Sequence, residues 1–96
     1  MATFHRNKNG VGWFKITWLD LARYSGNMMP ICGECLNDLV GRNNITLIPI
    51  LNEAYCPKCA PSVLKFIDHI CDEDKPIADR RERFYADYFG CSLEVP

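Results

Sequence analysis

Cys32-Gly-Glu-Cys35 and Cys56-Pro-Lys-Cys59 are two brackets of the form Cys-x-x-Cys, with twenty residues between them. A two-residue gap lets both thiolates of a bracket turn toward one ion, and Gly33 and Pro57 favour the tight turns that this requires. The spacing is typical of sites in which four thiolates hold one tetrahedral Zn²⁺. We therefore predict that Cys32, Cys35, Cys56 and Cys59 are the ligands of a single zinc ion.

A disulfide scaffold and a redox motif are the alternative interpretations of these brackets. Disulfide scaffolds form in oxidising compartments, which chains usually enter behind a signal peptide, and residues 1–10 contain no apolar signal segment. A thioredoxin-like motif usually has one Cys-x-x-Cys within a βαβ pattern, which this sequence lacks. Two brackets therefore favour a metal site over both alternatives. The identity of the metal is a separate question, because four thiolates accept iron as well as zinc in a similar geometry.

The predicted site is structural, because four thiolates leave no open coordination position and Zn²⁺ has no redox chemistry of its own. The sequence has no Gly-rich phosphate loop, no nucleophile elbow and no His-Glu-x-x-His helix. A zinc deaminase would need a His-x-Glu motif before a Pro-Cys-x-x-Cys pair, and the second bracket lacks both. We therefore expect that the protein is not an enzyme.

A chain of 96 residues is short for a domain held together by its hydrophobic core alone, so a bound structural metal ion would contribute much of the stability. We assign residues 1–96 to one zinc-binding domain, with a zinc module over 32–71 and a C-terminal helix over 75–90. No apolar run is long enough to span a membrane. The metal and the fold are therefore expected to be lost together.

The segment before the first bracket predicts a frayed polar start ahead of Phe14 and then one short helix. Thr17 and Asp20 have the spacing of a capping box, and Gly26 suits a left-handed helix end. We expect three side chains to share one face of this helix, namely Trp18, Leu19 and Ala22. Aromatic residues beside the helix start are interpreted as packing residues, with base stacking by Trp13, Phe14 and Trp18 as the alternative.

Between the brackets, residues 41–44 predict a turn and residues 45–51 a strand, which Pro49 would place at an edge or a bulge. Residues 52–55 are expected to turn into the second bracket. A helix then begins at Ala60-Pro-Ser, so the last two ligands lie at a helix N-terminus that should lower their pKa. Its predicted apolar face consists of Val63, Phe66, Ile67, Ile70 and Cys71.

A knuckle, a strand segment and a helix that starts at the last ligands together resemble the treble-clef class of zinc fingers, over residues 32 to about 71. Members of this class bind nucleic acids or proteins, and a few are enzymes, so the resemblance alone does not select a function. We predict an α+β fold: a small zinc-stapled domain with a treble-clef-like knuckle and short strands, followed by two amphipathic helices.

The second of these helices follows the acidic segment 72–74 and ends at Gly90. Its apolar stripe is rich in aromatic residues and consists of Ile77, Arg81, Phe84, Tyr85, Tyr88 and Phe89. Core packing is the first interpretation of this stripe. Any exposed part would be a protein-docking surface, because Tyr, Phe and Arg are common interface anchors.

Three further residues have chemistry of their own. Cys71 is interpreted as a small buried residue on an apolar helix face, whereas the sequence assigns no role to Cys91. His69 lies ten residues beyond Cys59, roughly 15 Å along a helix, and is therefore not expected to be a metal ligand.

The formal net charge is -1, but the charges are unevenly distributed. Residues 60–96 carry five basic and eight acidic residues, whereas residues 1–31 carry one acidic and four basic residues: Arg6, Lys8, Lys15 and Arg23. Four dispersed cations are few beside the roughly six to ten phosphate contacts of a typical DNA-binding protein. A protein partner is therefore favoured, and binding of DNA or RNA through these cations is the alternative.

In its length, its four-cysteine site and its flanking segments, the chain is similar to the zinc-containing type II-A anti-CRISPR proteins of bacteriophages and mobile elements. The resemblance implies a stoichiometric inhibitor in the bacterial cytoplasm that binds Cas9 and obstructs guide or target DNA. The resemblance assigns a role only to the four bracket cysteines, as structural zinc ligands. Acidic side chains would meet a basic surface of the nuclease; we assign this contact to Asp68, Asp72, Glu73, Asp74 and Asp79.

Overall fold

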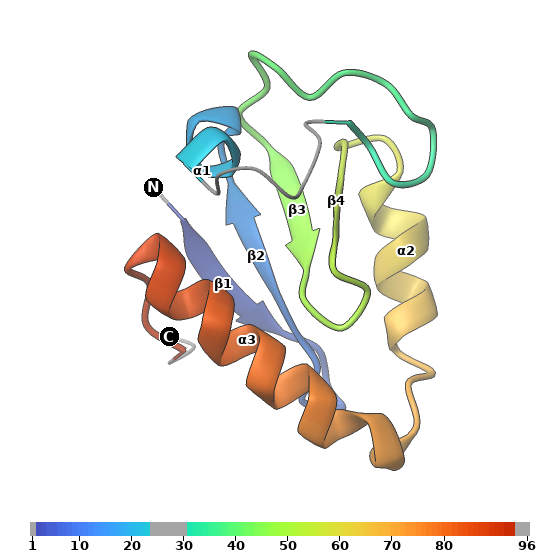
Figure 1. The fold of residues 1–96 in the computed structure, drawn as a ribbon. Helices are drawn as coiled ribbons and strands as arrows, with labels where there is room; N and C mark the ends of the chain where they lie inside the picture. Colours follow the sequence, from blue (N-terminus) through green and yellow to red (C-terminus); the bar gives the residue numbers. More distant parts are fainter. Residues whose placement is uncertain (1, 24–30, 94–96) are drawn as a thin grey trace.

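The structure is a computed structural model that describes residues 2–23 and 31–93 (Figure 1). Four strands form one sheet, in which each strand runs antiparallel to its neighbours in the order β1-β2-β3-β4. The strands are β1 (Thr3–Arg6), β2 (Gly12–Ile16), β3 (Ile45–Ile48) and β4 (Glu53–Tyr55). The helices are α1 (Trp18–Arg23), α2 (Ala60–Ile67) and α3 (Lys75–Phe89), and a 3₁₀ turn, η1 (Asp72–Asp74), precedes α3. The described chain therefore has the predicted α+β class.

The N-terminal segment forms the hairpin of β1 and β2, so the prediction of a frayed start ahead of Phe14 is wrong from Thr3 onward. Phe4 pairs with Phe14 across the two strands, and their ring centroids lie 5.0 Å apart. The side-chain oxygen of Asn7 accepts hydrogen bonds from the backbone N–H groups of Asn9 and Val11, both at 2.9 Å. The Asn7 side chain thus accepts the hydrogen bonds of two backbone N–H groups in the turn, and burial of the Phe4 ring holds β1 against β2.

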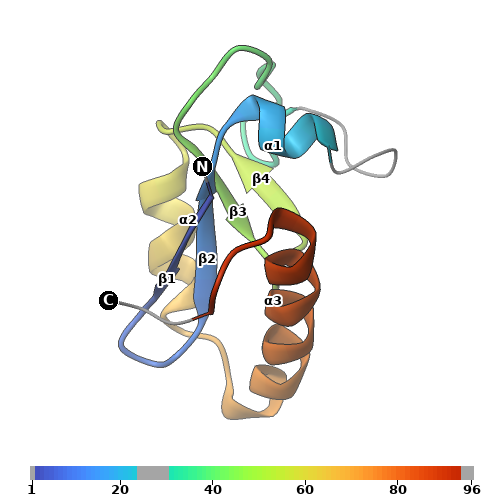
Figure 2. The same cartoon turned by 90° about the vertical axis from the view of Figure 1, so that its left-hand side faces the viewer.

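The sheet lies between two helices, with α3 on one face and α2 on the other (Figure 2). Phe14 points toward α3, and its ring centroid lies 5.6 Å from that of Phe89. Its cross-strand partner Leu47 lies on the same face, so Thr46 and Ile48 point toward α2. Because both faces of the sheet are covered here, all of β3 is buried.

The strand predicted over 45–51 is shorter in the structure and is not at an edge. β3 ends at Ile48 and pairs with β2 on one side and β4 on the other. Pro49 follows the strand, in the turn to β4, where no ladder hydrogen bond needs its missing N–H. Asn52 completes this turn with a positive φ of 56°. The predicted turn over 52–55 is therefore wrong, because β4 begins at Glu53.

The capping box of α1 is confirmed. Thr17 Oγ1 accepts a hydrogen bond from the Asp20 N–H at 3.3 Å, and Asp20 Oδ2 accepts one from the Thr17 N–H at 3.0 Å. The predicted shared face of Trp18 and Leu19 does not form the core side of α1, because Leu19 is 56% exposed, whereas Leu21 is 2% exposed and joins the core. Trp18 is half-buried against the core. The side chain of Ala22 and all of Gly26 lie outside the described residues.

The apolar face predicted for α2 is confirmed for Val63, Ile67 and Ile70 and is wrong for Phe66 and Cys71. Its buried residues are Ala60, Val63 and Ile67. Phe66 is 59% exposed, and Cys71 lies beyond the helix and is exposed, so its assignment as a buried residue is wrong. The helix ends at Ile67, and beyond it Ile70 is half-buried against the core.

The β1–β2 loop covers the C-terminal end of α2. Asn7 Nδ2 donates to the carbonyl of Ile67 at 3.4 Å, and Asn9 Nδ2 donates to that of Asp68 at 2.6 Å. Carbonyl groups in the last turn of a helix have no partner within the helix, so these two amides satisfy them. A polar loop far away in the sequence thus fixes where α2 ends.

α3 is attached to the sheet by a buried carboxylate that the sequence did not reveal. Glu82 is 1% exposed and accepts a hydrogen bond from the backbone N–H of Gly12 at 3.0 Å. Arg6 forms an ion pair with its other oxygen at 3.1 Å. A Cβ atom at Gly12 would lie 2.3 Å from the Phe4 ring, so only glycine allows this close approach.

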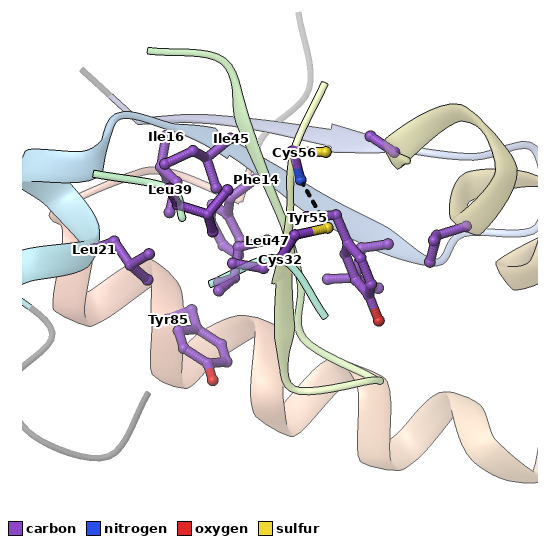
Figure 3. Packing of buried hydrophobic residues seen from close by; sticks show 14 of the residues in the cluster. Phe14, Ile16, Leu21, Cys32, Leu39, Ile45, Leu47, Tyr55, Cys56 and Tyr85 are labelled. Atoms are coloured by element: carbon purple, nitrogen blue, oxygen red, sulfur yellow. Dashed lines mark hydrogen bonds between the residues drawn. The ribbon is translucent and has the colours of Figure 1, made fainter. Parts of the chain in front are cut away.

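The aromatic stripe of α3 is only partly in the core. Tyr85 is buried with Phe14 and Leu47, as Figure 3 shows, and Phe89 is half-buried against the same cluster. Ile77, Arg81, Phe84 and Tyr88 are exposed, so the prediction of core packing is wrong for these four. The helix ends before Gly90, which has the predicted left-handed φ of 64°. No helix in the described part of the chain has the length and apolar character needed to cross a bilayer.

Candidate metal centre

The two brackets come together at one end of the sheet. The Sγ atoms of Cys32, Cys35, Cys56 and Cys59 all lie within 4.8 Å of one another, and these cysteines are free thiols. The Sγ atoms of Cys35 and Cys56 are 3.7 Å apart. The four predicted ligands therefore form one cluster that can hold a metal ion.

The cluster has the size that a thiolate-bound metal needs. A tetrahedral ion with metal–sulfur bonds of about 2.3 Å separates neighbouring sulfur atoms by about 3.8 Å. The 3.7 Å between Cys35 and Cys56 is close to this value and far from the roughly 2.05 Å of a disulfide bond. The residues present thus fit a metal better than a disulfide scaffold.

The first bracket is held by backbone hydrogen bonds on both sides. The Cys32 N–H donates to the carbonyl of Asn37 at 2.8 Å, and the Cys32 carbonyl accepts from the Leu36 N–H at 3.0 Å. The residue with a positive φ is Leu36, at 64°, and not Gly33. Gly33 instead lies close to β4, where a Cβ would come 2.4 Å from the end of the Glu53 side chain.

The second bracket joins β4 to α2. The carbonyl of Cys56 accepts hydrogen bonds from the N–H groups of Cys59 at 3.1 Å and Ala60 at 3.0 Å, which turns the chain tightly into the helix. Cys59 is the N-cap residue of α2. The Cys56 N–H also donates to Cys32 Sγ at 3.3 Å, drawn as the dashed line in Figure 3. This bond links the two brackets directly.

The thiols differ in how readily they ionise. Burial opposes ionisation of Cys32, but hydrogen bonds from the N–H groups of Cys35, Cys56 and Glu34 outweigh it and lower the pKa to about 6. Burial also opposes ionisation of Cys56, and the N–H of Cys59 lowers its pKa. Burial and hydrogen bonds with the neighbouring thiols raise the pKa of Cys59 to about 12. The expectation that both helix-end thiols have a lowered pKa is therefore confirmed for Cys56 and wrong for Cys59.

The cluster lies at the boundary between the core and solvent. Cys32 and Cys56 are buried, Cys59 is half-buried and Cys35 is exposed. The core side of the cluster is thus closed by protein, while the first bracket reaches the surface. A chelator in solution would have access from that side.

Tyr55 and Glu53 support the cluster and were missed by the sequence analysis. The Tyr55 hydroxyl donates to Glu53 Oε2 at 2.8 Å, and burial together with this hydrogen bond raises the pKa of Tyr55. The Gly33 N–H donates to the carbonyl of Ala54 at 2.8 Å, which ties the first bracket to β4. A strand of three residues leaves no periodic signal, so the pattern of the sequence did not reveal this support.

The remaining cysteines and the histidine stand apart from the cluster. Cys71 and His69 are exposed. Cys91 is half-buried with its Sγ 3.5 Å from the carbonyl of Ala2, and burial raises its pKa. None of the three belongs to the group of possible ligands among the described residues.

The five acidic residues assigned to a partner surface fall into two groups. Asp68 follows α2, and Asp72, Glu73 and Asp74 make up η1, so four of them lie in the connection between α2 and α3. Asp72 pairs with Lys75 at 2.9 Å, which lowers its pKa. Asp79 lies within α3 and pairs with Arg83 at 3.2 Å.

These features define an α+β protein with a four-cysteine cluster that can hold a metal ion. No protein-family model, no curated protein and no solved structure matches the chain.

Proposed function

We propose that the cluster holds one structural Zn²⁺ and that the protein acts by binding another protein, without catalysis. The spacing of the four Sγ atoms carries the metal part of this proposal, because it fits a tetrahedral thiolate site. A closed set of four protein ligands offers a substrate no coordination position. The metal then stabilises the fold, and the surface performs the function.

The order of elements supports a treble-clef-like zinc module. The first bracket is a turn that supplies two ligands, β3 and β4 form a hairpin, and the second bracket begins α2. In this arrangement one ion links a loop, a hairpin and a helix start. It therefore replaces part of a hydrophobic core that a chain of this size lacks.

Serine at Cys56 tests the structural role of the metal. We expect Cys56→Ser to lose its zinc, measured by elemental analysis, and its cooperative thermal unfolding, followed by circular dichroism. Cys71→Ser is the matched control, because Cys71 is exposed and outside the cluster, and it should retain both. A Cys56→Ser protein that is folded and free of zinc would contradict the proposal.

The acidic connection between α2 and α3 is the proposed contact with a basic protein surface. Asp72, Glu73 and Asp74 lie in one turn, in which Asp72 and Glu73 are exposed and Asp74 is half-buried, so they can approach a cationic partner together. The resemblance to type II-A anti-CRISPR proteins makes Cas9 the first partner to test. On this proposal the protein obstructs the surface of Cas9 that engages guide RNA or target DNA.

Capture of purified Cas9, with and without guide RNA, tests this partner. Reversal of Asp72, Glu73 and Asp74 to lysine should weaken capture and leave the zinc content unchanged. Equal capture by the reversed variant would reject the acidic surface, and no capture of Cas9 in either state would reject this partner.

Nucleic-acid binding is the second candidate, and one observation favours it. The rings of His5 and Trp13 stack at 5.6 Å, and Lys15 is exposed on the neighbouring part of β2. Arg6, however, pairs with buried Glu82, which removes one cation from the basic segment. Binding of labelled DNA or RNA at physiological salt that is lost in Trp13→Ala would promote this candidate above the protein partner.

A further inference from the structure

A groove lies beside the metal centre, between α2 and the hairpin of β3 and β4. It has a volume of about 380 Å³, and its lining residues are Glu34, Leu51, Tyr55, Ser62, Val63 and Phe66. Tyr55 and Val63 are buried and form its floor, whereas Phe66 is 59% exposed and stands at its rim. Most of this lining is apolar, as it is in sites that take up an apolar group.

Hydrogen bonds and core packing hold the groove in shape. The Tyr55 hydroxyl donates to Glu53 Oε2 at 2.8 Å, which fixes the Tyr55 ring, and Val63 belongs to the hydrophobic core. The Leu51 N–H donates to the carbonyl of Ile48 at 3.1 Å, which closes the turn that carries Leu51. The groove is therefore formed before a partner arrives.

One end of the groove is acidic. Glu34 is the charged residue of its lining and is exposed. The Glu53 carboxylate lies at the same end, because a Cβ on Gly33, the residue before Glu34, would come 2.4 Å from it. Neither carboxylate forms an ion pair within the described parts of the chain. The site thus combines an apolar floor with two carboxylates at one end.

The groove also depends on both brackets. Glu34 lies between the two cysteines of the first bracket, and Phe66 lies on the helix that the second bracket begins. The ion that we propose would therefore hold the two sides of the groove at a fixed distance from each other.

We propose that this groove docks a basic segment of a partner protein, with an apolar side chain against Phe66 and a Lys or Arg side chain beside Glu34. The stem of a Lys or Arg side chain can lie along apolar surface while its charged end reaches a carboxylate. Both carboxylates would repel a phosphate backbone, so the charge favours a protein over a nucleic acid. This inference rests on the proposed protein-binding function and adds a second contact to the acidic connection.

Selection from a displayed library of short random peptides, against the protein purified with its metal, tests the proposal. We expect enriched peptides to carry Lys or Arg close to Leu, Met or Phe. Phe66→Ser and Glu34→Lys should each weaken binding of a synthesised peptide by about tenfold or more, measured by fluorescence anisotropy, with the zinc content unchanged. Two matched controls, Leu19→Ser and Asp87→Lys, change exposed residues that do not line the groove and should bind as the parent does.

The other outcomes overturn the proposal in distinguishable ways. Peptides that bind Phe66→Ser and Glu34→Lys normally but fail on the lysine reversal of Asp72, Glu73 and Asp74 would move the contact to the acidic connection and leave protein binding intact. Binding of a small alkylammonium cation that Phe66→Ser abolishes, with no enriched peptide, would make the groove a small-molecule site. No enriched peptide together with no capture of Cas9 would reject the proposed protein-binding function as well.

Discussion

The metal centre and helix α3 are attached to the same sheet by different means. Beside the centre, residues 36–44 contain no helix or strand and expose two large apolar side chains, Leu36 and Val40. α3 has fifteen helical residues, buries Tyr85 and places the carboxylate of Glu82 against β2. The difference teaches that packing holds α3, whereas the brackets, on the proposal of a structural metal, depend on an ion held by their four thiols.

Metal removal should have the largest effect and should reach the brackets first. A structural Zn²⁺ contributes on the order of 10 kcal/mol, which is comparable with the whole stability of a small domain. During titration with a chelator, we expect amide hydrogen exchange to accelerate over residues 31–44 and 56–60 before it does so in α3. Simultaneous loss of protection in both regions would remove the distinction between them.

Glu82→Ala should have the second largest effect, on the side of the molecule that packing holds. The substitution leaves the Gly12 N–H buried without its acceptor, which costs about 1–3 kcal/mol. The melting temperature should therefore fall by roughly 5–15 °C while the zinc content stays unchanged. Asp79→Ala, which breaks only an exposed ion pair, is the control and should change stability by less than about 1 kcal/mol.

Two glycine substitutions compare the regions at the scale of one methyl group. Gly12→Ala places a Cβ against the Phe4 ring in the core and should cost about 1–3 kcal/mol. Gly33→Ala meets the end of the Glu53 side chain, which can move aside, so its cost should be smaller. Chemical denaturation of both variants with metal present measures the difference, and a greater loss from Gly33→Ala would reverse the comparison.

The pH dependence contributed by Glu82 should be the smallest effect. Burial raises the pKa of Glu82 above its ordinary value of 4.5, against the opposing hydrogen bond from Gly12 and charge of Arg6. The folded protein therefore holds this proton more tightly than the unfolded chain does, and the resulting stabilisation is present below pH 4.5 and lost as the pH rises through the folded pKa.

Glu82→Gln, which cannot titrate, isolates this contribution. From about pH 4 to about pH 7 the stability of the parent protein should fall relative to that of Glu82→Gln. A rise of the parent over the same range would mean that Arg6 and Gly12 outweigh burial and hold the pKa below its ordinary value.

The sequence predicted the features that depend on short-range chemistry. The two-residue gaps of the brackets, the cap of Thr17 on Asp20 and the helix end at Gly90 each involve neighbours within a few residues, so their geometry follows from local spacing. The structure brings the four cysteines together as this spacing requires.

The features that were missed depend on contacts between distant segments. Phe4 gains its strand only because β2 lies beside it, and Glu82 is buried only because α3 places it over Gly12. Helical periodicity placed Phe66 and Phe84 on the apolar faces of their helices, and both were therefore assigned to the core. Periodicity does not show how far the sheet extends beneath a helix, and both side chains are exposed. Local pattern identifies apolar side chains, but tertiary placement decides which are buried.

The most direct test of the central claim is X-ray absorption at the zinc edge, combined with elemental analysis, on protein purified without added metal. The account predicts one zinc per chain, bound by four sulfur atoms at about 2.3 Å. A shell that contains nitrogen or oxygen ligands, or a folded protein that carries no metal, would contradict it.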